Sequence, residues 1–456
     1  MDKSVDVVIV GAGTAGLVAA RDLVRSGSEV LVLEARDRVG GRLLNAELPG
    51  GSPIEVGGQW VGPTQHQVMA LIEELGLRTY PTHHAGRHIA EVGRSRSEYT
   101  GRIPRANPLT LLDIAQTQLR LDRLASKVVR TEPWEYEQAE SLDAQTFDTW
   151  LRNHAHTTDG RAFFRLITEA VFATGPEDMS ALWANVYIGA AGGLDALINV
   201  AEGAQQDRVV GGTQTIALAM AQELGDRIVL NSPVTEIDGD DTGVRVRADG
   251  VTVRARRAVI AVPPPLVARI RFTPGLPGDR DQLVQRMPMG RVIKVNVAYD
   301  EPFWRAEGWS GQANSDRRAL GTVFDNTPFD GAPGVLVGFL EGRHADAGAR
   351  LTSADRRARV LEDLAGYFGP RARKPIDYIE KDWAEEEYSR GCYGAFTTPG
   401  TLTRFGPALR RPTGPLHWAG TETATRWPGY IDGAAESGHR VAMEINSALT
   451  TAVANK

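Results

Sequence analysis

One cysteine, Cys392, is the most chemically distinctive residue of this chain. It lies in the run YSRGCY over 388–393, and a lone thiol can form neither an internal disulfide nor the cysteine cluster of a zinc or iron–sulfur site. The thiol is therefore either a small buried apolar group or a reactive sulfur. Two more runs follow it closely, WAGTET over 418–423 and WPGY over 427–430.

A glycine-rich loop near the other end of the chain, GAGTAG over 11–16, has the spacing of a dinucleotide-binding turn. Gly11 permits a tight turn from strand to helix, Gly13 lets the backbone approach a pyrophosphate, and Gly16 allows close helix–strand packing. A helix that begins near Ala15 would point its positive end at the phosphates. Glu34, about 20 residues further on, is placed to accept hydrogen bonds from an adenosine ribose.

The segments on either side of this loop are expected to be the strands and the helix that hold it in place. The β-branched run over 5–10 and the run over 29–34 are typical of strands buried on both faces, and apolar residues at helical spacing over 17–24 predict a helix between them. Together they form a complete βαβ unit, which makes the dinucleotide interpretation much stronger than the glycines alone. A nucleotide site also favours the reactive interpretation of Cys392.

The run ARDRVGGR over 35–42 continues past what a nicotinamide enzyme needs. Its glycines could supply further backbone N–H groups, and its arginines guanidinium forks, to the same pyrophosphate. On residue chemistry alone, a solvated charged turn is the alternative. The candidate contacts here are Ala35, Arg36, Gly41 and Arg42.

Composition excludes several classes of protein. The 456 residues are enough for two structural domains, and 42% hydrophobic with 24% charged residues is typical of a soluble globular protein. A net charge of −6 argues against a nucleic acid or an anionic membrane as partner. The start of the chain has no signal-peptide pattern, no apolar run is long enough to span a bilayer, and the histidines lack metal-ligand spacing. We therefore expect a cytoplasmic protein without a metal site.

In these motifs the sequence resembles the flavin-containing amine oxidase family and, within it, the monoamine oxidases. The resemblance covers nearly the whole chain and lies in DVVIVG (6–11), LEARDRVGGR (33–42), GGQWVGPTQ (57–65), SALW (180–183), VIK (292–294), EPFW (301–304) and the stretch 383–440. It implies FAD as cofactor and an α/β fold in which a Rossmann-type FAD-binding domain is interleaved with a substrate-binding domain of mixed sheet plus helices. We expect the FAD-binding domain to comprise 1–85, 205–285 and 390–456, and the substrate-binding domain 86–204 and 286–389.

The resemblance also assigns roles around the flavin. In monoamine oxidases a cysteine in a Gly-Cys-Tyr context is bonded through sulfur to the 8α position of FAD, which implies that role for Cys392; a non-covalent flavin beside an unreactive thiol, as in bacterial relatives, is the alternative. Tyr393 and Tyr430 would be the two aromatic rings in front of the flavin, and Lys294 the buried lysine near its N5 atom. Further FAD contacts would be Gly57, Gly58, Gln59, Trp60, Val234, Trp383, Gly420, Thr421, Glu422, Gly429 and Ile431.

A largely apolar substrate cavity is implied as well. Thr322 is smaller than the aromatic usual at its position, so a wider entrance is expected. Glu169 replaces an apolar residue; pointing inward it could pair with a distal ammonium and favour diamines, and pointing outward it would lie on a helix surface. The expected lining residues are Glu169, Ala170, Leu197, Ile198, Gln205, Thr322 and Phe339.

We therefore expect a flavin-dependent amine oxidase, a homodimer without nucleic-acid or membrane partners, that converts a primary amine and dioxygen to aldehyde, ammonia and hydrogen peroxide. A putrescine or diamine oxidase is the nearest alternative. An L-amino-acid oxidase would need a cation facing the substrate carboxylate, which the sequence does not place. A non-catalytic flavin scaffold is disfavoured by the presence of Cys392, Tyr393, Tyr430 and Lys294 together.

Overall fold

The N-terminal strand β1 (Asp2–Val10) lies inside an eight-stranded sheet of the computed structural model, which describes residues 2–93, 95–101, 106–128, 130–240 and 242–454. β1 runs parallel to β2 (Val30–Leu33) on one side and to β13 (Val251–Ile260) on the other. The sheet order is β10-β2-β1-β13-β12-β11-β14, with β20 also paired to β13. The remaining strands are β10 (Ile228–Val229), β11 (Val234–Asp240), β12 (Gly243–Ala248), β14 (Arg271–Thr273) and β20 (Leu416–Trp418).

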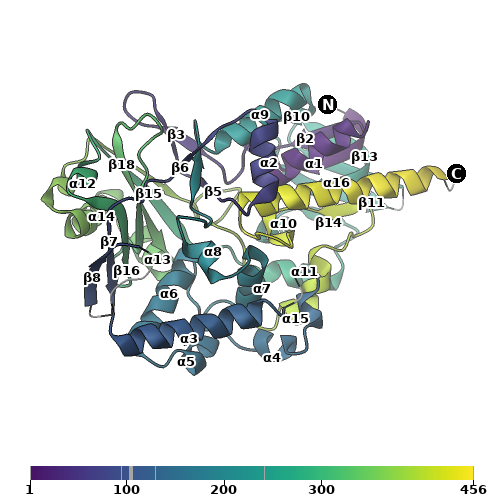
Figure 1. Ribbon diagram of the computed structural model, residues 1–456. Coiled ribbons are helices and arrows are strands. Elements are labelled where there is room, and N and C mark those ends of the chain that lie inside the picture. The colour runs from purple at the N-terminus through teal and green to yellow at the C-terminus, as the bar shows by residue number, and fades with distance from the viewer. Residues whose placement is uncertain (1, 94, 102–105, 129, 241, 455–456) are drawn as a thin grey trace.

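The two ends of the chain pack together on this sheet. The glycine-rich loop leads into α1 (Thr14–Arg25), which packs against the C-terminal helix α16 (Ile431–Ala454) and against α9 (Gln214–Leu224). Figure 1 shows α16 lying beside α1. Apolar side chains of these helices form one core with β1 and β2, and α2 (His66–Glu74) closes it. The predicted βαβ unit therefore forms as the periodicity of its apolar residues requires.

A second, seven-stranded sheet carries the other half of the fold, in the order β19-β15-β18-β17-β16-β7-β8. Its central strands β15 (Val292–Tyr299) and β18 (Gly334–Glu341) are buried at every position. Ile293, Val295 and Leu340 face α14 (Ser353–Phe368) in one core, so the alternate residues of both strands face the opposite side. The other strands are β7 (Arg87–Val92), β8 (Ser95–Tyr99), β16 (Trp309–Ser315), β17 (Thr322–Asp325) and β19 (Asp377–Asp382).

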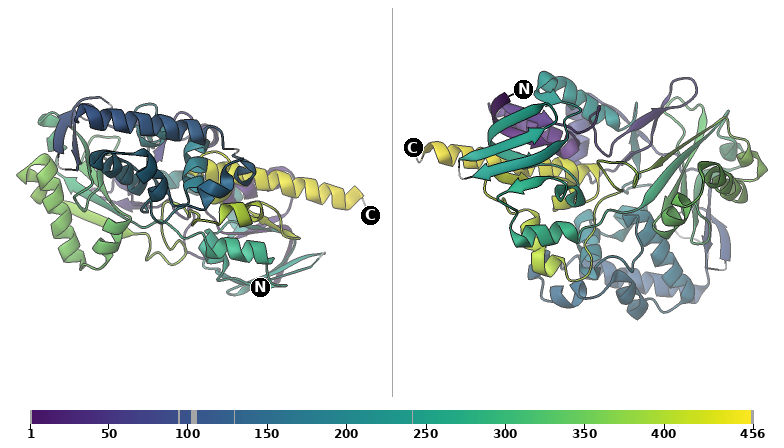
Figure 2. Two further views of the ribbon diagram at one scale, coloured as in Figure 1. Left: turned by 90° about the horizontal axis from the view of Figure 1, so that it is seen from below. Right: turned by 180° about the vertical axis from the view of Figure 1, so that it is seen from behind.

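Helices from the middle of the chain lie below both sheets in the view of Figure 1, and they lie below the sheets again in the right-hand view of Figure 2. Trp150 and Trp183 anchor their shared core. These helices are α3 (Pro108–Ala125), α4 (Ala139–Asp143), α5 (Phe147–His154), α6 (Thr158–Phe172), α7 (Ala181–Ala191) and α8 (Leu194–Ile198). Shorter elements complete the fold: β3 (Asn45–Glu47), β4 (Pro53–Glu55), β5 (Trp60–Val61), β6 (Thr79–Pro81), β9 (Asp207–Val209), α10 (Pro264–Val267), α11 (Gly278–Gln285), α12 (Phe303–Ala306), α13 (Arg343–Ala349) and α15 (Leu402–Phe405).

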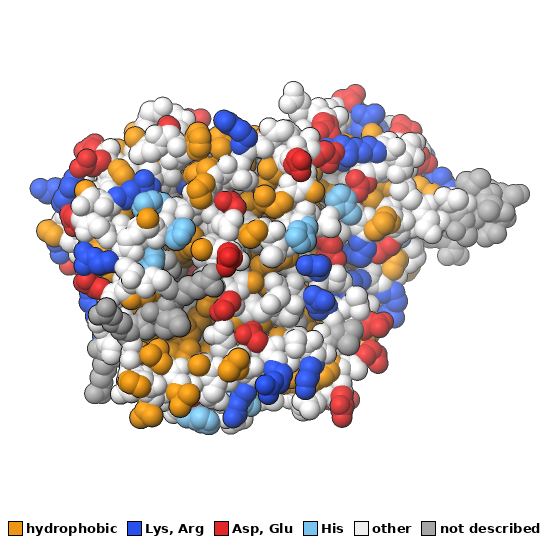
Figure 3. Space-filling model, in the orientation of Figure 1, with side chains coloured by type: hydrophobic (Ala, Val, Ile, Leu, Met, Phe, Trp, Pro, Cys, Tyr) orange, Lys and Arg blue, Asp and Glu red, His pale blue; other side chains and the backbone are white. Residues whose placement is uncertain are grey.

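The two sheets fall on either side of the expected domain division. Strands of the first sheet lie in 1–85, 205–285 and 390–456, and those of the second in 86–204 and 286–389. This separation supports the division, which stays our proposal. Acidic and basic side chains are interspersed with apolar ones over the face shown in Figure 3. Within the described ranges, no helix combines the length and the apolar character that crossing a membrane requires.

Candidate active site

Two cavities meet inside the molecule. One, of about 220 Å³, lies where the parallel strands β1, β2 and β13 end, and the other, of about 510 Å³, lies between the second sheet and the helices α6 and α8. Carboxyl ends of parallel strands form the usual ligand crevice of an open α/β sheet. Both cavities share the same small group of lining residues, so ligands in the two would meet there: Gly58, Tyr393, Gly429, Tyr430 and Ile431.

The smaller cavity, which we call the cofactor cleft, has the chemistry of a dinucleotide site. Gly11 adopts a φ of +105°, and a Cβ on Gly16 would lie 2.0 Å from the Gly11 carbonyl oxygen, so the turn requires both glycines. No side chain caps α1 at Gly13, which leaves its positive end to the cleft. Glu34 is buried there, and its carboxylate accepts hydrogen bonds from the backbone N–H groups of Ala12 at 2.7 Å and Arg36 at 3.0 Å. These residues fit the FAD that the motifs imply.

Most of the expected cofactor contacts line this cleft, and several lie just behind it. The lining residues include Gly11, Gly13, Ala15, Glu34, Ala35, Arg36, Gly41, Arg42, Gly58, Val234, Cys392, Gly420, Thr421, Gly429, Tyr430 and Ile431. Gly57, Gln59 and Trp60 line the larger cavity. Gly16 packs under the turn, while Trp383 and Glu422 are buried behind the cavity walls; the indole of Trp383 donates a hydrogen bond to the Val56 carbonyl at 2.8 Å.

The two arginines that were expected at the pyrophosphate have carboxylate partners in the protein. Arg36 donates to Glu386 at 3.0 Å, and Arg42 donates to Glu422 at 2.7 Å and to the Tyr393 carbonyl at 2.8 Å. Burial would raise the pKa of Glu422, yet the Arg42 guanidinium brings it below its ordinary value. These pairs join segments more than 340 residues apart in the sequence, and they hold the Cys392 segment against the N-terminal loop.

Cys392 lies on the cofactor cleft and is 6% exposed. Burial raises the pKa of its thiol to about 12, although Arg42 and Lys294 act in the opposite direction. The sulfur is therefore protonated at neutral pH in the chain alone, and a reactive thiolate would need the charge distribution of a bound ligand. The position of Cys392 is suited to a bond with the cofactor, but the thiol must first lose its proton.

Lys294 projects from β15 into the larger cavity and is 3% exposed. Its ammonium donates hydrogen bonds to the Gly57 carbonyl at 2.8 Å and to the side-chain oxygen of Gln59. The amide nitrogen of Gln59 donates in turn to Asn326 at 2.8 Å. Burial lowers the pKa of Lys294 to about 7, so the amine is close to half protonated at neutral pH.

The two candidate cage tyrosines are held by different neighbours. The ring centroid of Tyr430 lies 4.9 Å from that of Trp427 and 6.0 Å from that of Tyr187. The Tyr393 ring lies 6.4 Å from Phe339, and its hydroxyl donates a 2.7 Å hydrogen bond to Glu341. Both tyrosines line both cavities, so each can contact the cofactor and the substrate.

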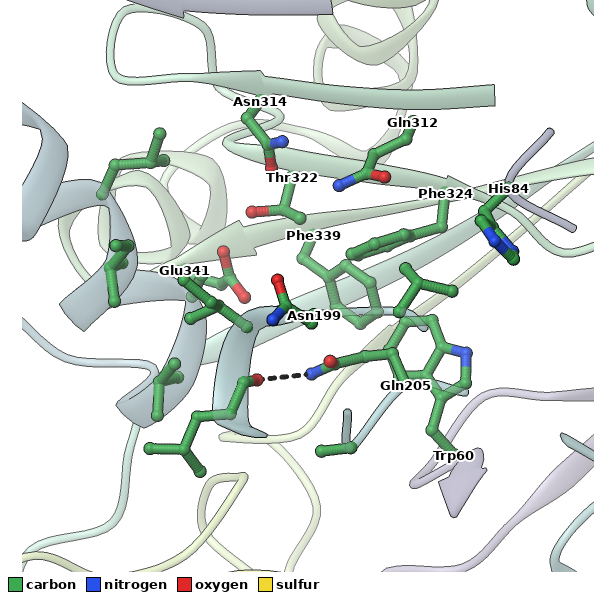
Figure 4. A pocket seen from close by; sticks show the side chains of 18 of the residues that line it. Trp60, His84, Asn199, Gln205, Gln312, Asn314, Thr322, Phe324, Phe339 and Glu341 are labelled. Atoms are coloured by element: carbon green, nitrogen blue, oxygen red, sulfur yellow. Dashed lines mark hydrogen bonds between the residues drawn. The ribbon is translucent and has the colours of Figure 1, made fainter. Parts of the chain in front are cut away.

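The larger cavity, which we call the substrate cavity, is lined by apolar side chains such as Phe324 and Phe339 and by polar ones such as Asn199 and Asn314 (Figure 4). The amide of Gln205 donates to the Leu197 carbonyl at 2.9 Å, which leaves its oxygen without a partner. Of the seven expected substrate contacts, six line the cavity: Ala170, Leu197, Ile198, Gln205, Thr322 and Phe339.

Glu169 differs from the inward orientation that would favour diamines. It is buried outside the cavity lining, 3.7 Å from Arg165 and 3.5 Å from Arg343. The physical reason is the phase of α6: Ala170 faces the cavity, and one residue back along a helix the side chain points about 100° away. Two arginines therefore face this carboxyl, although burial still raises its pKa.

Glu341 lines the cavity, and it is one of the residues that the sequence interpretation missed. It is buried on β18 two residues after Phe339, and alternate residues of a strand face the same side. That alternation is the signal that could have found it. Burial raises the pKa of Glu341 to about 8, and the nearby carboxylate of Glu169 acts in the same direction.

Comparisons with known proteins agree with this geometry. The model of the family described as flavin containing amine oxidoreductase matches residues 14–446. A relative in Mycobacterium tuberculosis that is named as a flavin-containing monoamine oxidase is 44% identical over 98% of this chain and 97% of its own. The flavin-containing amine oxidase A of Canis lupus familiaris is 36% identical over 97% of this chain and 85% of its own.

Two solved structures share the fold over nearly their whole length. Putrescine oxidase bound to putrescine has a TM-score of 0.95 at 36% identity, covering 98% of this chain and 100% of that one. Cyclohexylamine oxidase from Brevibacterium oxydans has a TM-score of 0.94 at 34% identity, covering 98% and 99%. The predicted α/β flavoprotein fold and the FAD cofactor are thereby confirmed. The chain belongs to the family of flavin-containing amine oxidoreductases.

Proposed function

We propose that this flavin amine oxidase deaminates a primary amine, giving an aldehyde, ammonia and hydrogen peroxide, with Tyr393 and Tyr430 positioning the amine and Lys294 assisting the reaction with dioxygen. The observation that carries this proposal is the junction of the two cavities. Tyr393 and Tyr430 line both the cofactor cleft and the substrate cavity, so an amine between them would lie against whatever fills the cleft.

FAD, when bound in the cleft, would accept two reducing equivalents from the amine and return them to dioxygen. The protein's own part is to select and orient the amine. Apolar side chains such as Leu197, Ile198 and Phe339 disfavour an ammonium in the cavity, and aromatic faces hold a neutral amine in one orientation. With the amine already deprotonated, no side chain need act as general base, and activity should rise with pH toward the pKa of the substrate.

Lys294 is suited to the second half of the reaction. Its amine is fixed by Gly57 and Gln59 at the wall of the cavity, and with a pKa of about 7 it can gain or lose a proton near neutral pH. Such a group can supply a proton, or a positive charge, where dioxygen becomes reduced. We propose this role for Lys294 on its position and protonation state.

We further propose that Cys392 is bonded to the flavin, because it lines the cleft in the Gly-Cys-Tyr context. Forming this bond would remove one hydrogen from the thiol and one from the 8α methyl group of the flavin, and the two electrons released would pass to dioxygen. The homodimer and the cytoplasmic location expected from the sequence stay predictions, which light scattering and cell fractionation can test.

An amine panel read out by peroxide tests the proposed reaction. Holoenzyme should release peroxide with at least one short primary amine, and the same amine should bleach the flavin absorbance under anaerobic conditions. Bleaching without peroxide would contradict the oxidase assignment, and neither signal with any amine would contradict amine oxidation itself.

A further inference from the structure

A carboxyl group faces the substrate cavity with acceptor sites left open. Glu341 is 3% exposed, and its Oε1 accepts the Tyr393 hydroxyl at 2.7 Å. The other donor that acts on this carboxyl is the hydroxyl of Thr322, which lies on the neighbouring strand β17 at the same wall of the cavity (Figure 4). Oε2 of Glu341 and Oγ1 of Thr322 are both buried and make no other hydrogen bond. One hydroxyl cannot fill the acceptor sites of both oxygens, and open buried acceptors are unfavourable unless a ligand supplies further donors.

Nothing among the described residues gives Glu341 a cationic partner. Arg165 and Arg343, which flank the neighbouring carboxyl of Glu169, form ion pairs with that residue. Lys294 lines the same cavity, but its ammonium donates to Gly57 and Gln59. A buried carboxyl in this situation stays protonated, which agrees with its pKa of about 8.

We propose that Glu341, together with the hydroxyl of Thr322, forms a subsite for the second ammonium group of a diamine whose first amine is oxidised. The inference rests on the proposed function, because it takes the reacting amine to lie beside Tyr393. Glu341 is one hydrogen bond beyond the hydroxyl of that ring, so a short alkyl chain extending from the reacting nitrogen can reach it. An ammonium there supplies N–H donors to Oε2 and Oγ1 and compensates the carboxylate charge.

The subsite works only with an ionised carboxyl, which gives it a pH signature. Glu341 has a pKa of about 8, so about a tenth of the groups are ionised at pH 7 and about nine tenths at pH 9. A distal alkyl ammonium with a lysine-like pKa keeps its proton over this range. The ratio of kcat/KM for putrescine to kcat/KM for butylamine should therefore rise about tenfold from pH 7 to pH 9. Deprotonation of the reacting amine affects both substrates and largely cancels in the ratio.

Glu341→Gln is the direct variant, because glutamine still accepts the hydrogen bond of Tyr393 while removing the charge. One charge-assisted contact corresponds to a loss of about 10- to 100-fold, so the putrescine-to-butylamine ratio at pH 9 should fall by that factor and lose its pH dependence. Glu169→Gln is the matched control: it removes the other buried carboxylate of this region, and the ratio should stay within about threefold of wild type.

A binding measurement separates the subsite from catalysis. A diamine with two methyl groups on each carbon next to nitrogen has no hydrogen to lose there, so it binds without being oxidised. Titrated into oxidised holoenzyme at pH 7 in two buffers of different ionisation enthalpy, it should release close to one more proton at Glu341 than the corresponding monoamine does. In Glu341→Gln that additional proton should disappear.

The outcomes distinguish the two proposals. A ratio that is independent of pH in wild type, or that responds to Glu169→Gln and not to Glu341→Gln, would overturn the subsite. Peroxide from butylamine together with such a result would leave the amine oxidase function standing. Absence of peroxide with every amine would overturn the proposed function, while the proton-release titration would still decide whether Glu341 binds a second ammonium.

Discussion

Replacing Lys294 with methionine should separate what this amine costs the fold from what it contributes to the reaction. Methionine keeps the length of the side chain and removes the charge and the donors. The buried amine has its pKa lowered from 10.5 to about 7, which corresponds to about 5 kcal/mol of unfavourable free energy at low pH. Losing the donor leaves the Gly57 carbonyl and the Gln59 amide oxygen unpaired, at about 1–3 kcal/mol each. The two effects nearly cancel, so Lys294→Met should unfold with a free energy close to that of wild type near pH 7.

The pH dependence of that comparison has a definite sign. The unfolded chain keeps a proton on the lysine up to about pH 10.5, and the folded chain only up to about pH 7, so wild-type stability rises with pH between these values. Methionine does not titrate. The free energy of unfolding of Lys294→Met relative to wild type should therefore fall by about 2 kcal/mol from pH 7 to pH 9.

Denaturant unfolding at both pH values measures this difference, and stopped-flow mixing of reduced enzyme with dioxygen measures the functional part. Reoxidation should slow by at least tenfold in Lys294→Met, while anaerobic reduction by amine changes less. A stability difference that is constant with pH would show that the amine is not held neutral by burial. An unchanged reoxidation rate would remove Lys294 from the oxidative half of the reaction.

Four further variants test the cofactor cleft and the cage. Acid precipitation of the wild-type protein should give a yellow pellet. The Cys392→Ala variant should give a colourless pellet and leave FAD in the supernatant. Free FAD released from the wild-type protein would establish the non-covalent alternative. Tyr430→Ala should lower turnover at least tenfold with FAD still bound, whereas Tyr430→Phe keeps the ring and most of the turnover; equal turnover in all three proteins would contradict the cage. Arg42→Met leaves the Glu422 carboxylate buried without its partner, so the free energy of unfolding in a denaturant titration should fall by about 3–5 kcal/mol. An unchanged denaturation midpoint would show that the Arg42–Glu422 pair does not hold the C-terminal segment in place.

Local pattern was enough to predict the nucleotide half of the fold. The strand–loop–helix–strand unit is specified by residues that are close together in the sequence. The spacing of its apolar residues and the positions of its glycines both indicate the same order of strand, turn and helix. The pattern of apolar residues gave a wrong strand length where a strand continues through two adjacent arginines. Taken from the sequence alone, the runs 251–255 and 258–262 predict two strands, because Arg256 and Arg257 separate them. The structure instead has one strand, β13, over Val251–Ile260, because β1 pairs with it from Asp2 to Val10. Pairing partners decide strand length, and they are not visible in the run itself.

The substrate cavity was harder to predict, because a shift of one residue along helix α6 determines whether an acidic or an apolar side chain lines it. Placing residues 169 and 170 together on the wall ignores that adjacent helical side chains diverge, and only Ala170 lines the cavity. Resemblance to a family predicts roles only for residues at positions that the family members have in common. It does not reveal an acid such as Glu341, which only the alternation along β18 indicates.

In the proposed diamine subsite, Lys294 and Glu341 together would let one cavity admit both a neutral amine and a diamine. They lie on the paired strands β15 and β18, where Lys294 is opposite Phe339 and Glu341 is opposite Val292. Burial lowers the pKa of the lysine to about 7 and raises that of the glutamate to about 8, so between these values both groups are mainly uncharged. A neutral amine then meets walls without charge, and a second ammonium draws a proton off Glu341 only when it is present. In the proposed subsite the charge that recognises a diamine would be created by the diamine itself, so a monoamine would not have to enter a charged site.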